Sequence, residues 1–411
     1  MFRKSVPHLR LLSKFSDKQL RNCSLKFFHY SNNGGEYHFL NKFNYVGNHG
    51  IYWKHPESPF VIRITDDFEK CEEGNRTDVD TCWLHFSKNV LNDLSKDFNE
   101  TQLIDVINEL RNWKPIQNLP KRKFEWVVNL PRVYCTFPKV PYEQKVFCAK
   151  HLMSTFLVDD EMEKLFALPE SNTACVEFIT NLRNIFYDRF DDITDMNKFK
   201  CRDNISDATI EGAIRAMNIH IELGHSAKQL LKPKIYDFYQ TLGHTYLDGV
   251  EKERKLFQQH LPQKRIISEQ EGRACRFYTV GFFWILADTL TDEKYIFHLN
   301  TLNPLTYLAT YVILLENDLC GAFKDRTIEF SPMTFYHTDN WEMSEVTKAK
   351  IIVNKINTAK KAFEDIYQLM PREHLEYYVH LEKLMTMLLD YNFVSGCRKG
   401  NTRYGWVPTL D

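Results

Sequence analysis

The 411-residue sequence has little glycine and little proline, 15 of each, which excludes collagen-like and other fibrous proteins. Its 10 cysteines include no CxxC pair, so neither a zinc ribbon nor a thioredoxin-like site is expected. No run of about 18 apolar residues occurs, and no membrane-spanning helix is predicted. The chain also has no excess of charge of either sign, since it contains 53 Lys and Arg residues and 54 Asp and Glu residues. A net charge of -1 offers no basic field for nucleic acid.

Aromatic residues, by contrast, are abundant: 7 Trp, 20 Tyr and 30 Phe make up 14% of the chain. Hydrophobic residues at 43% and charged residues at 26% are ordinary for a globular protein, which excludes extended disorder for most of the chain. Cysteines scattered singly along a long chain are typical of reduced thiols in an intracellular protein. We therefore expect a cytoplasmic location.

The first 50 residues differ in composition from the rest. Lys and Arg dominate the start as far as Lys26, where Asp17 is the one acidic residue, and glycine and asparagine interrupt the remainder. We interpret residues 1–50 as a basic, poorly structured extension and residues 51–411 as one domain. An organelle transit peptide is the alternative interpretation of the basic start.

Hydrophobic residues recur at helical spacing through most of the remaining chain. A helix is predicted from about Val79 to Leu94, and a second one ends near Trp113. Further helices are predicted over residues 142–166, 172–190, 206–222, 227–260, 266–291, 304–325, 343–369 and 371–392. Strand-like alternation is scarce, apart from Phe60–Thr65. We therefore predict an all-α protein whose core is one large helical bundle.

The predicted helix over 142–166 carries a cluster of carboxylates near its end. Asp159 or Asp160 and then Glu163 continue the stripe on which Phe156 lies, so acidic groups follow an apolar helix face. Carboxylates at the mouth of an apolar cavity suit hard cations such as Mg²⁺, which keeps water ligands and bridges to phosphate. A solvent-exposed charge cluster is the alternative interpretation. A similar segment, 191–195, does not follow such an apolar helix, and we prefer the first.

A second polar segment, residues 317–325, ends the predicted helix over 304–325. Asn303-Pro304 predicts the start of this helix, with Asn as N-cap and Pro at the first helical position. Near its end, three residues are spaced i, i+4 and i+8 on one face, beside Lys324: Asn317, Gly321 and Asp325. An amide oxygen, a carboxylate and an ammonium on adjacent turns can hold a metal-bound phosphate.

Together, the two segments resemble the metal motifs of class I terpene synthases of the compact, microbial-type α-domain form. DDEME at 159–163 is similar to their aspartate-rich motif, and NDLCGAFKD at 317–325 to their second motif, usually written ND(L/I)xSxxKE. EQEGRACRFYTVGFF, which begins at Glu269, resembles their segment with a diphosphate-sensing arginine before a helix break. Arg276 is the best match for that arginine and Arg273 the alternative. Arg403-Tyr404 resembles their RY pair.

The resemblance covers about residues 55–411 and departs from the family pattern at three positions. Gly321 stands where Ser or Thr is usual, so a hydroxyl ligand is missing and water is expected in its place. Asp325 replaces Glu and is one methylene shorter. Phe277 follows Arg276 where a second arginine is often found. Long aromatic-rich chains of this form also occur in animals such as octocorals.

The resemblance implies a single helical bundle around a deep apolar active-site cavity, and it implies roles for particular residues. Three Mg²⁺ ions are expected, with Mn²⁺ as a substitute, and their ligands would be Asp159, Asp160, Glu163, Asn317, Gly321 and Asp325. The donors to the diphosphate would be Arg276, Lys324, Arg403 and Tyr404. Phe156, one turn before Asp159, is expected to line the cavity beside the reacting carbocation.

The function that the resemblance implies is that of a terpene cyclase, a carbon–oxygen lyase of isoprenoid biosynthesis. Its substrate would be an acyclic prenyl diphosphate, C20 geranylgeranyl diphosphate first and C15 farnesyl diphosphate next, and its products a cyclic terpene and diphosphate. The expected state is a monomer or homodimer. A chain-elongating prenyl diphosphate synthase is one alternative, although it would carry aspartates where Asn317 stands. A non-catalytic helical isoprenoid-binding protein is another, favoured only by Gly321 and Asp325.

Overall fold

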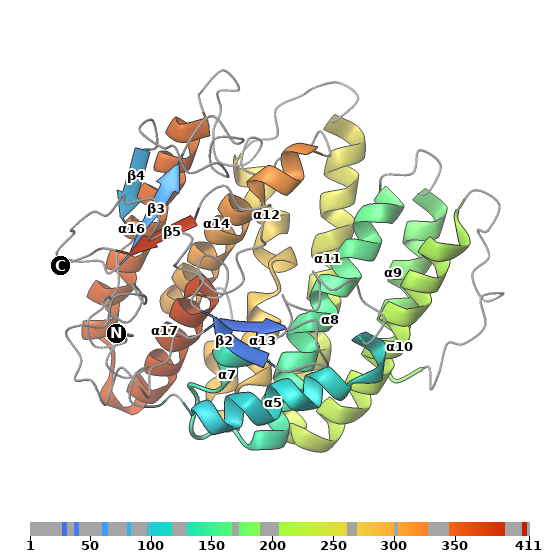
Figure 1. Cartoon of the computed structure of the whole chain (residues 1–411), viewed down its shortest axis with the longest axis horizontal. Helices are drawn as coiled ribbons and strands as arrows, with labels where there is room; N and C mark the ends of the chain where they lie inside the picture. The colour runs from blue at the N-terminus through green and yellow to red at the C-terminus, as the bar shows by residue number, and fades with distance from the viewer. Residues whose placement is uncertain are drawn as a thin grey trace.

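The computed structural model describes residues 27–30, 37–40, 60–64, 80–83, 97, 99–116, 130–166, 172–189, 205–260, 269–299, 303–327, 345–390 and 405–408. Most of these residues are helical, and the long helices stand side by side in a bundle with α5 across one end (Figure 1). The all-α prediction is confirmed for the body of the chain.

The helices agree in most bounds with the sequence-based expectations. They are α5 (Glu100–Asn112), α7 (Pro131–Tyr134), α8 (Tyr142–Phe166), α9 (Asn172–Phe186), α10 (Asp207–Leu230), α11 (Pro233–His260), α12 (Glu269–Thr279), α13 (Phe282–Asp288), α14 (Pro304–Thr327), α16 (Glu345–Gln368) and α17 (Leu375–Asp390). Short 3-10 helices are η2 (Lys114–Ile116), η4 (Glu293–His298) and η5 (Arg372–His374). None of the described helices is long and apolar enough to cross a membrane.

Two small antiparallel sheets accompany the bundle. Strand β1 (Phe27–Tyr30) pairs with β2 (Tyr37–Leu40), and β3 (Phe60–Ile64) lies between β4 (Asp80–Trp83) and β5 (Gly405–Pro408). The alternation noted at Phe60–Thr65 thus falls on strand β3. The hairpin of β1 and β2 falls within residues 1–50, most of which lie outside the described residues, so the division into extension and domain stays a prediction.

The helix predicted from Val79 is wrong at its start. Asp80–Trp83 forms strand β4, which pairs with β3 and, together with β3, packs against α16 (Figure 1). A four-residue segment cannot express a helical period by itself, and pairing with a neighbouring strand overrides the weak local preference.

Two predicted helix boundaries also need correction. α10 continues through Gly224 to Leu230, because an isolated glycine costs a helix only about 1 kcal/mol and the flanking Leu223 is buried. The single helix predicted over 266–291 is divided into α12 and α13 at Gly281, whose φ of 70° is left-handed. Glycine reaches this conformation without the steric penalty of a Cβ atom. The break directs α13 back into the bundle.

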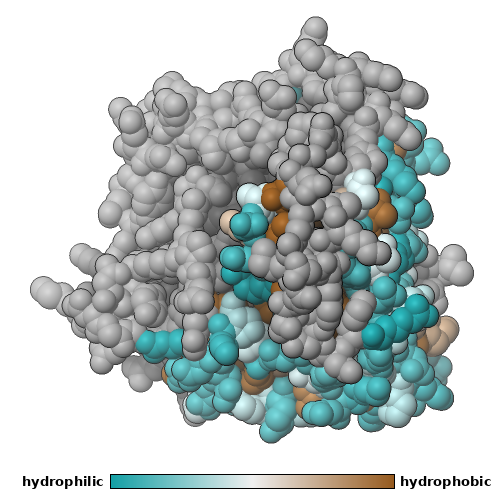
Figure 2. Space-filling model, turned by 90° about the vertical axis from the view of Figure 1, so that its right-hand side faces the viewer, coloured by the Kyte–Doolittle hydropathy of each residue, from teal (hydrophilic) through white to brown (hydrophobic). Residues whose placement is uncertain are grey.

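The core is one apolar cluster to which every long helix contributes. α8 packs against α10 and α5, α11 against α12 and α13, and α14 against α16 and α17. On the outside, the described residues are mostly hydrophilic on the face shown in Figure 2, with a few hydrophobic residues near its centre. This division is what amphipathic helices around a common core produce.

Close approach of α11 and α12 requires glycine at position 249. A Cβ atom there would lie 2.9 Å from the Cβ atom of Tyr278 and 3.2 Å from the carbonyl oxygen of Cys275. We predict that Gly249→Ala lowers the free energy of unfolding by about 1–3 kcal/mol, because α12 must shift. Gly224→Ala in α10 is the control, since nothing lies within 4 Å of its added methyl group. Equal stability of the two variants in urea unfolding would contradict this packing.

Candidate functional site

α14 carries the second polar segment, and its start is built as the sequence predicts. The side-chain oxygen of Asn303 accepts hydrogen bonds from the backbone N–H groups of Leu305 and Thr306, at 3.0 and 3.1 Å. From this capped end the helix runs through buried apolar residues to Asn317, which is half-buried, and Asp318, which is buried. The helix therefore places the Asn317 amide and the Asp318 carboxylate next to each other on the same turn.

Arg276, in the last turn of α12, faces both of these side chains. Its guanidinium donates to the Oδ1 atoms of Asn317 and Asp318, each at 3.1 Å, and makes a second, shorter bond to Asp318. It also donates to the hydroxyl of Thr279 at 3.2 Å. Arg273, the alternative diphosphate sensor, instead lies over the ring of Tyr311, 5.7 Å from its centroid. The contacts therefore favour Arg276 as the arginine of this site.

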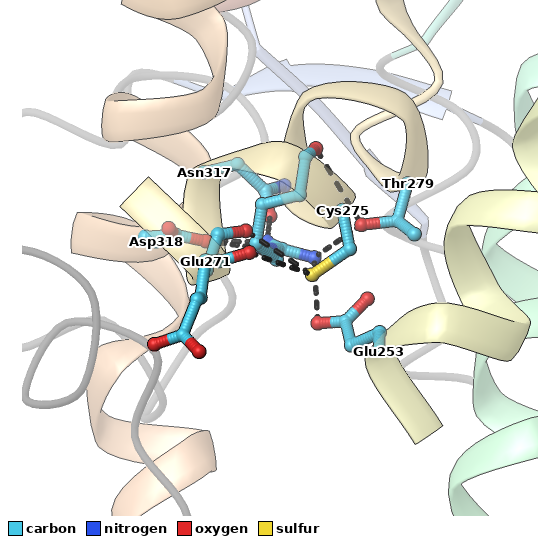
Figure 3. Close-up of polar contacts among 8 residues, drawn as sticks. Glu253, Glu271, Cys275, Thr279, Asn317 and Asp318 are labelled. Atoms are coloured by element: carbon cyan, nitrogen blue, oxygen red, sulfur yellow. Dashed lines mark hydrogen bonds and ion pairs between the residues drawn. The ribbon is translucent and has the colours of Figure 1, made fainter. Parts of the chain in front are cut away.

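Glu253 on α11 completes the group from a third helix. Its carboxylate lies 3.6 Å from the Arg276 guanidinium, and both side chains are only 13% exposed. Figure 3 shows Glu253, Asn317 and Asp318 converging from two sides on the end of α12. We call Glu253, Arg276, Asn317 and Asp318 the Arg276 site.

Burial makes the Glu253 carboxyl a weaker acid than an ordinary glutamate. It raises the pKa from 4.5 to about 7, against the opposing effects of the Arg276 charge and a Thr279 hydrogen bond. The charges of Asp159 and Asp318 raise the pKa of Glu253 further. Asp159 is thus near enough for its charge to act on the Arg276 site, although it comes from α8.

The aspartate-rich segment lies at the end of α8. Asp159 is exposed, Asp160 is half-buried, and Phe156 is half-buried against the core. Glu163 lies in the last turn of the same helix, but its side chain is outside the described residues. The carboxylates thus follow an apolar face, as the spacing predicts.

Other predicted residues cannot be placed in the same way. Gly321, Lys324 and Asp325 lie on the last turns of α14, and their surroundings fall outside the described residues. Arg403, Tyr404 and the second acidic segment at 191–195 lie outside the described residues altogether. The roles of all these residues stay predictions.

Sequence reasoning missed Glu253 and gave Asp318 and Thr279 no role. Glu253 lies in a run of charged residues, 251–255, which by composition alone is typical of a solvent-exposed helix face. Its seven-residue spacing from Tyr246 places the two residues on one face of a helix, but only the structure shows that Tyr246, and with it this face, is buried. In the sequence, Asp318 is recognisable only as part of the second motif.

The oxygen atoms at this end of the bundle fit a hard cation. Carboxylates of Asp159 and Asp160 and the amide oxygen of Asn317 are the donors that Mg²⁺ prefers. Among the described residues, however, no three His, Cys, Asp or Glu side chains form a metal-binding group. Asn317 Oδ1 accepts from Arg276 instead, so a cation bound at Asn317 would compete with the guanidinium for this oxygen.

Comparison with known proteins identifies the fold in which these residues lie. A (+)-bicyclogermacrene synthase of Penicillium expansum is 21% identical over 388 residues, 89% of this chain and 93% of that protein. A linalool/nerolidol synthase of Streptomyces clavuligerus superposes with a TM-score of 0.53 over 72% of this chain and 97% of its own, at 11% identity. A 2-methylisoborneol synthase of Streptomyces coelicolor A3(2), solved with Mg²⁺ and 2-fluorogeranyl diphosphate, superposes with a TM-score of 0.52 over 72% and 92%, at 12% identity.

The chain has the class I terpene synthase fold. The resemblance recognised in its motifs is confirmed by the curated relative and by the fold, both of which point to terpene synthases, enzymes of the lyase class. No protein-family model matches the chain. In this terpene synthase fold, the Arg276 site lies where α12 ends and α13 begins, between α11 and α14.

The Glu253 carboxyl predicts a pH dependence of stability. Between pH 4.5 and about 7 the unfolded chain releases this proton while the folded protein keeps it, so the free energy of unfolding falls as pH rises, by roughly 3 kcal/mol. Glu253→Gln removes this loss. We expect the variant to gain stability relative to the wild type across that range in metal-free urea unfolding. Glu211→Gln, an exposed site on α10, is the control, and parallel pH profiles for Glu253→Gln and wild type would contradict the burial effect.

Proposed function

We propose that the protein is a terpene cyclase that ionises an acyclic prenyl diphosphate and closes the resulting carbocation to a cyclic terpene. The observation that supports this most directly is the Arg276 site. A buried guanidinium, an amide and carboxylates from α11, α12 and α14 meet there, at one end of an apolar bundle. These charged and polar groups would hold the anionic leaving group. The buried apolar residues of α13 come next along the chain after the Arg276 site.

The diphosphate would be held by cationic and hydroxyl side chains of the chain itself. Arg276 already presents several N–H groups to carboxylate and amide oxygens, and phosphate oxygens suit the same planar fork. Lys324, Arg403 and Tyr404 are proposed as further donors. Negative charge grows on the diphosphate as the carbon–oxygen bond breaks, so donors fixed in place stabilise the transition state more than the substrate.

Mg²⁺ is proposed as the cofactor, three ions in all, since the oxygen donors at the ends of α8 and α14 fit it. Asp159, Asp160 and Glu163 would hold it on one side, and Asn317 and Asp325 on the other, with water beside Gly321. When bound, such ions neutralise charge on the departing diphosphate. The crystal structure of the related 2-methylisoborneol synthase contains Mg²⁺ and a prenyl diphosphate analogue, which supports the choice.

The carbocation would be enclosed by aromatic residues next to this site. Phe156 and Tyr278 are half-buried, and the rings that follow along α12 and α13 are buried: Phe277, Phe282, Phe283 and Trp284. Each ring face attracts a cation by roughly 0.5–2 kcal/mol. Such walls also exclude water, which would otherwise trap the cation before it cyclises.

The test is an incubation of the purified full chain with C10, C15, C20 and C25 prenyl diphosphates, with and without Mg²⁺, followed by gas chromatography with mass detection. We propose C20 as the substrate, with C15 next, which is the order that the resemblance recognised in the sequence implies. A metal-dependent cyclic product from one chain length is the expected result. Longer prenyl diphosphates, formed only when the C5 isopentenyl unit is added, would replace the proposal with a chain-elongating synthase. Folded protein with no product from any substrate would contradict catalysis. Cytoplasmic location and oligomeric state stay predictions.

A further inference from the structure

A second group of polar side chains lies buried around the indole of Trp284, on α13. His151 from α8 meets the indole edge-on with ring centroids 4.2 Å apart, and His220 from α10 is stacked on it at 5.7 Å. Tyr239 from α11 lies 5.5 Å away, and Asp288 ends α13. All five side chains are buried, none more than 2% exposed. We call these five residues the Trp284 cluster.

The Trp284 cluster has too few hydrogen bonds for its polar atoms. One short contact joins His151 Nδ1 to Asp288 Oδ2. Five buried atoms have no partner among the described residues: His151 Nε2, His220 Nδ1, the Tyr239 hydroxyl, Trp284 Nε1 and Asp288 Oδ1. Each unmade bond costs about 1–3 kcal/mol, and a group of five in one place calls for a ligand that is both donor and acceptor.

The electrostatics of the Trp284 cluster select a neutral ligand. Burial lowers the pKa values of His151 and His220 to about 3 and raises that of Asp288, so the neutral forms are favoured. An ion would find no opposite charge here. Water is the neutral molecule that both donates and accepts, and buried waters typically make about three bonds to groups of this kind.

The Trp284 cluster lies deeper on the same helices that form the Arg276 site. On α8, His151, Thr155 and Asp159 are spaced i, i+4 and i+8 along one stripe, and eight residues of helix span roughly 12 Å. On α11, Tyr246 contacts the Trp284 ring at 5.5 Å and precedes Glu253 by seven residues on the same face. Water held by the Trp284 cluster would therefore lie below the diphosphate, toward the hydrocarbon end of a substrate.

We infer that the Trp284 cluster is a buried water site, and that this water adds to the final carbocation, so that the protein makes a terpene alcohol. The second part rests on the proposed function. In this step a lone pair of the water oxygen forms the new carbon–oxygen bond, and one water proton passes to an unpartnered imidazole nitrogen of the cluster. The charge moves from carbon to imidazole, and no oxidant or reductant is needed.

The water site is tested without activity by two identical substitutions. Tyr239→Phe removes a hydroxyl that has no partner among the described residues, whereas Tyr377→Phe removes one bonded to Thr306 at 3.0 Å in an equally buried place. If water binds Tyr239, both variants lose a hydrogen bond, and both melting temperatures fall, by about 1–3 °C. A dry cluster predicts the opposite sign, because Tyr239→Phe then removes an unsatisfied polar atom. An unchanged or higher melting temperature for Tyr239→Phe would overturn the site.

The alcohol is tested by turnover in water enriched in ¹⁸O. The wild type should form an alcohol that carries the label, and Tyr239→Phe should lower the ratio of alcohol to hydrocarbon at least about threefold, while Tyr377→Phe leaves it unchanged. Hydrocarbon products alone, an unlabelled alcohol, or an unchanged ratio in Tyr239→Phe would overturn the proposed step. Absence of any product from the wild type would instead contradict the proposed function, and the melting temperatures would still decide the water site.

Discussion

Replacement of Arg276 by glutamine is expected to lower the turnover of the prenyl diphosphate by about a hundredfold or more. The loss of one fixed donor to a developing anion commonly has an effect of this size. The structure adds a second consequence, because Arg276 neutralises the buried Asp318 and faces Glu253. Removing one partner of a buried ion pair leaves an uncompensated charge, which typically costs about 3–5 kcal/mol of stability.

Arg273→Gln is the matched control for Arg276→Gln. Both arginines lie on α12, three residues apart, but the Arg273 guanidinium lies over the Tyr311 ring, whereas the Arg276 guanidinium donates to Asn317. Turnover should therefore change little in Arg273→Gln, within about threefold. The reverse ranking of the two variants would assign the diphosphate contact to Arg273. Thermal unfolding of each variant, measured beside turnover, separates loss of fold from loss of chemistry.

The second large effect is expected at Asp159. Asp159→Asn should reduce Mg²⁺-dependent turnover by about a hundredfold or more, because an amide offers a divalent cation a weaker ligand than a carboxylate does. Stability should hardly change, since the Asp159 side chain is exposed. The measurement is the initial rate over a range of Mg²⁺ concentrations, at which the variant should also need more metal for half-maximal rate.

Asp237→Asn is the control for Asp159→Asn, since Asp237 is likewise an exposed aspartate on a long helix, α11. It should retain the wild-type rate and Mg²⁺ dependence. If Asp159→Asn also retained them, the aspartate-rich motif would have to be sought elsewhere, and the segment at 191–195 would be the next candidate. Asn317→Ala tests the opposite side of the site and is expected to be similarly impaired.

Arg276 and the metal ligands are linked through one atom. Asn317 Oδ1 accepts from Arg276 in this structure, although it is also the proposed ligand of a cation. A cation at Asn317 would therefore displace the guanidinium from this oxygen, which leaves its N–H groups available to phosphate oxygens. If the proposed cation binds, competition for this one acceptor would couple the two halves of the site.

Most of the helical framework was predictable because its causes are local. The start of α14 follows from Asn303 and Pro304, which cap and begin a helix wherever they precede an apolar period. The bounds of α8 follow in the same way from a long apolar segment after Pro141. The strand β4 was not predictable, because its partner β3 lies some 20 residues away in the chain and supplies the hydrogen bonds.

The candidate site was only partly predictable. Its motifs could be recognised because residue type and spacing along a helix, as for Asn317 and Asp159, are properties of the sequence itself. Glu253 and the Trp284 cluster could not, since their character depends on neighbours from other helices. A glutamate in a charged run is ordinary until packing buries it. His151 and His220 are far apart in the sequence, and only the packing of both against Trp284 brings them together.

The sequence by itself determined the helical class, the order of the polar segments and the kind of chemistry that their oxygen and nitrogen atoms can support, because these depend on composition and on spacing within one helix. The tertiary structure alone decided that Arg276 rather than Arg273 faces Asn317, that Glu253 joins them, and that five polar atoms are shut away around Trp284. These outcomes depend on how helices distant in sequence pack, and packing also sets the burial that shifts each pKa.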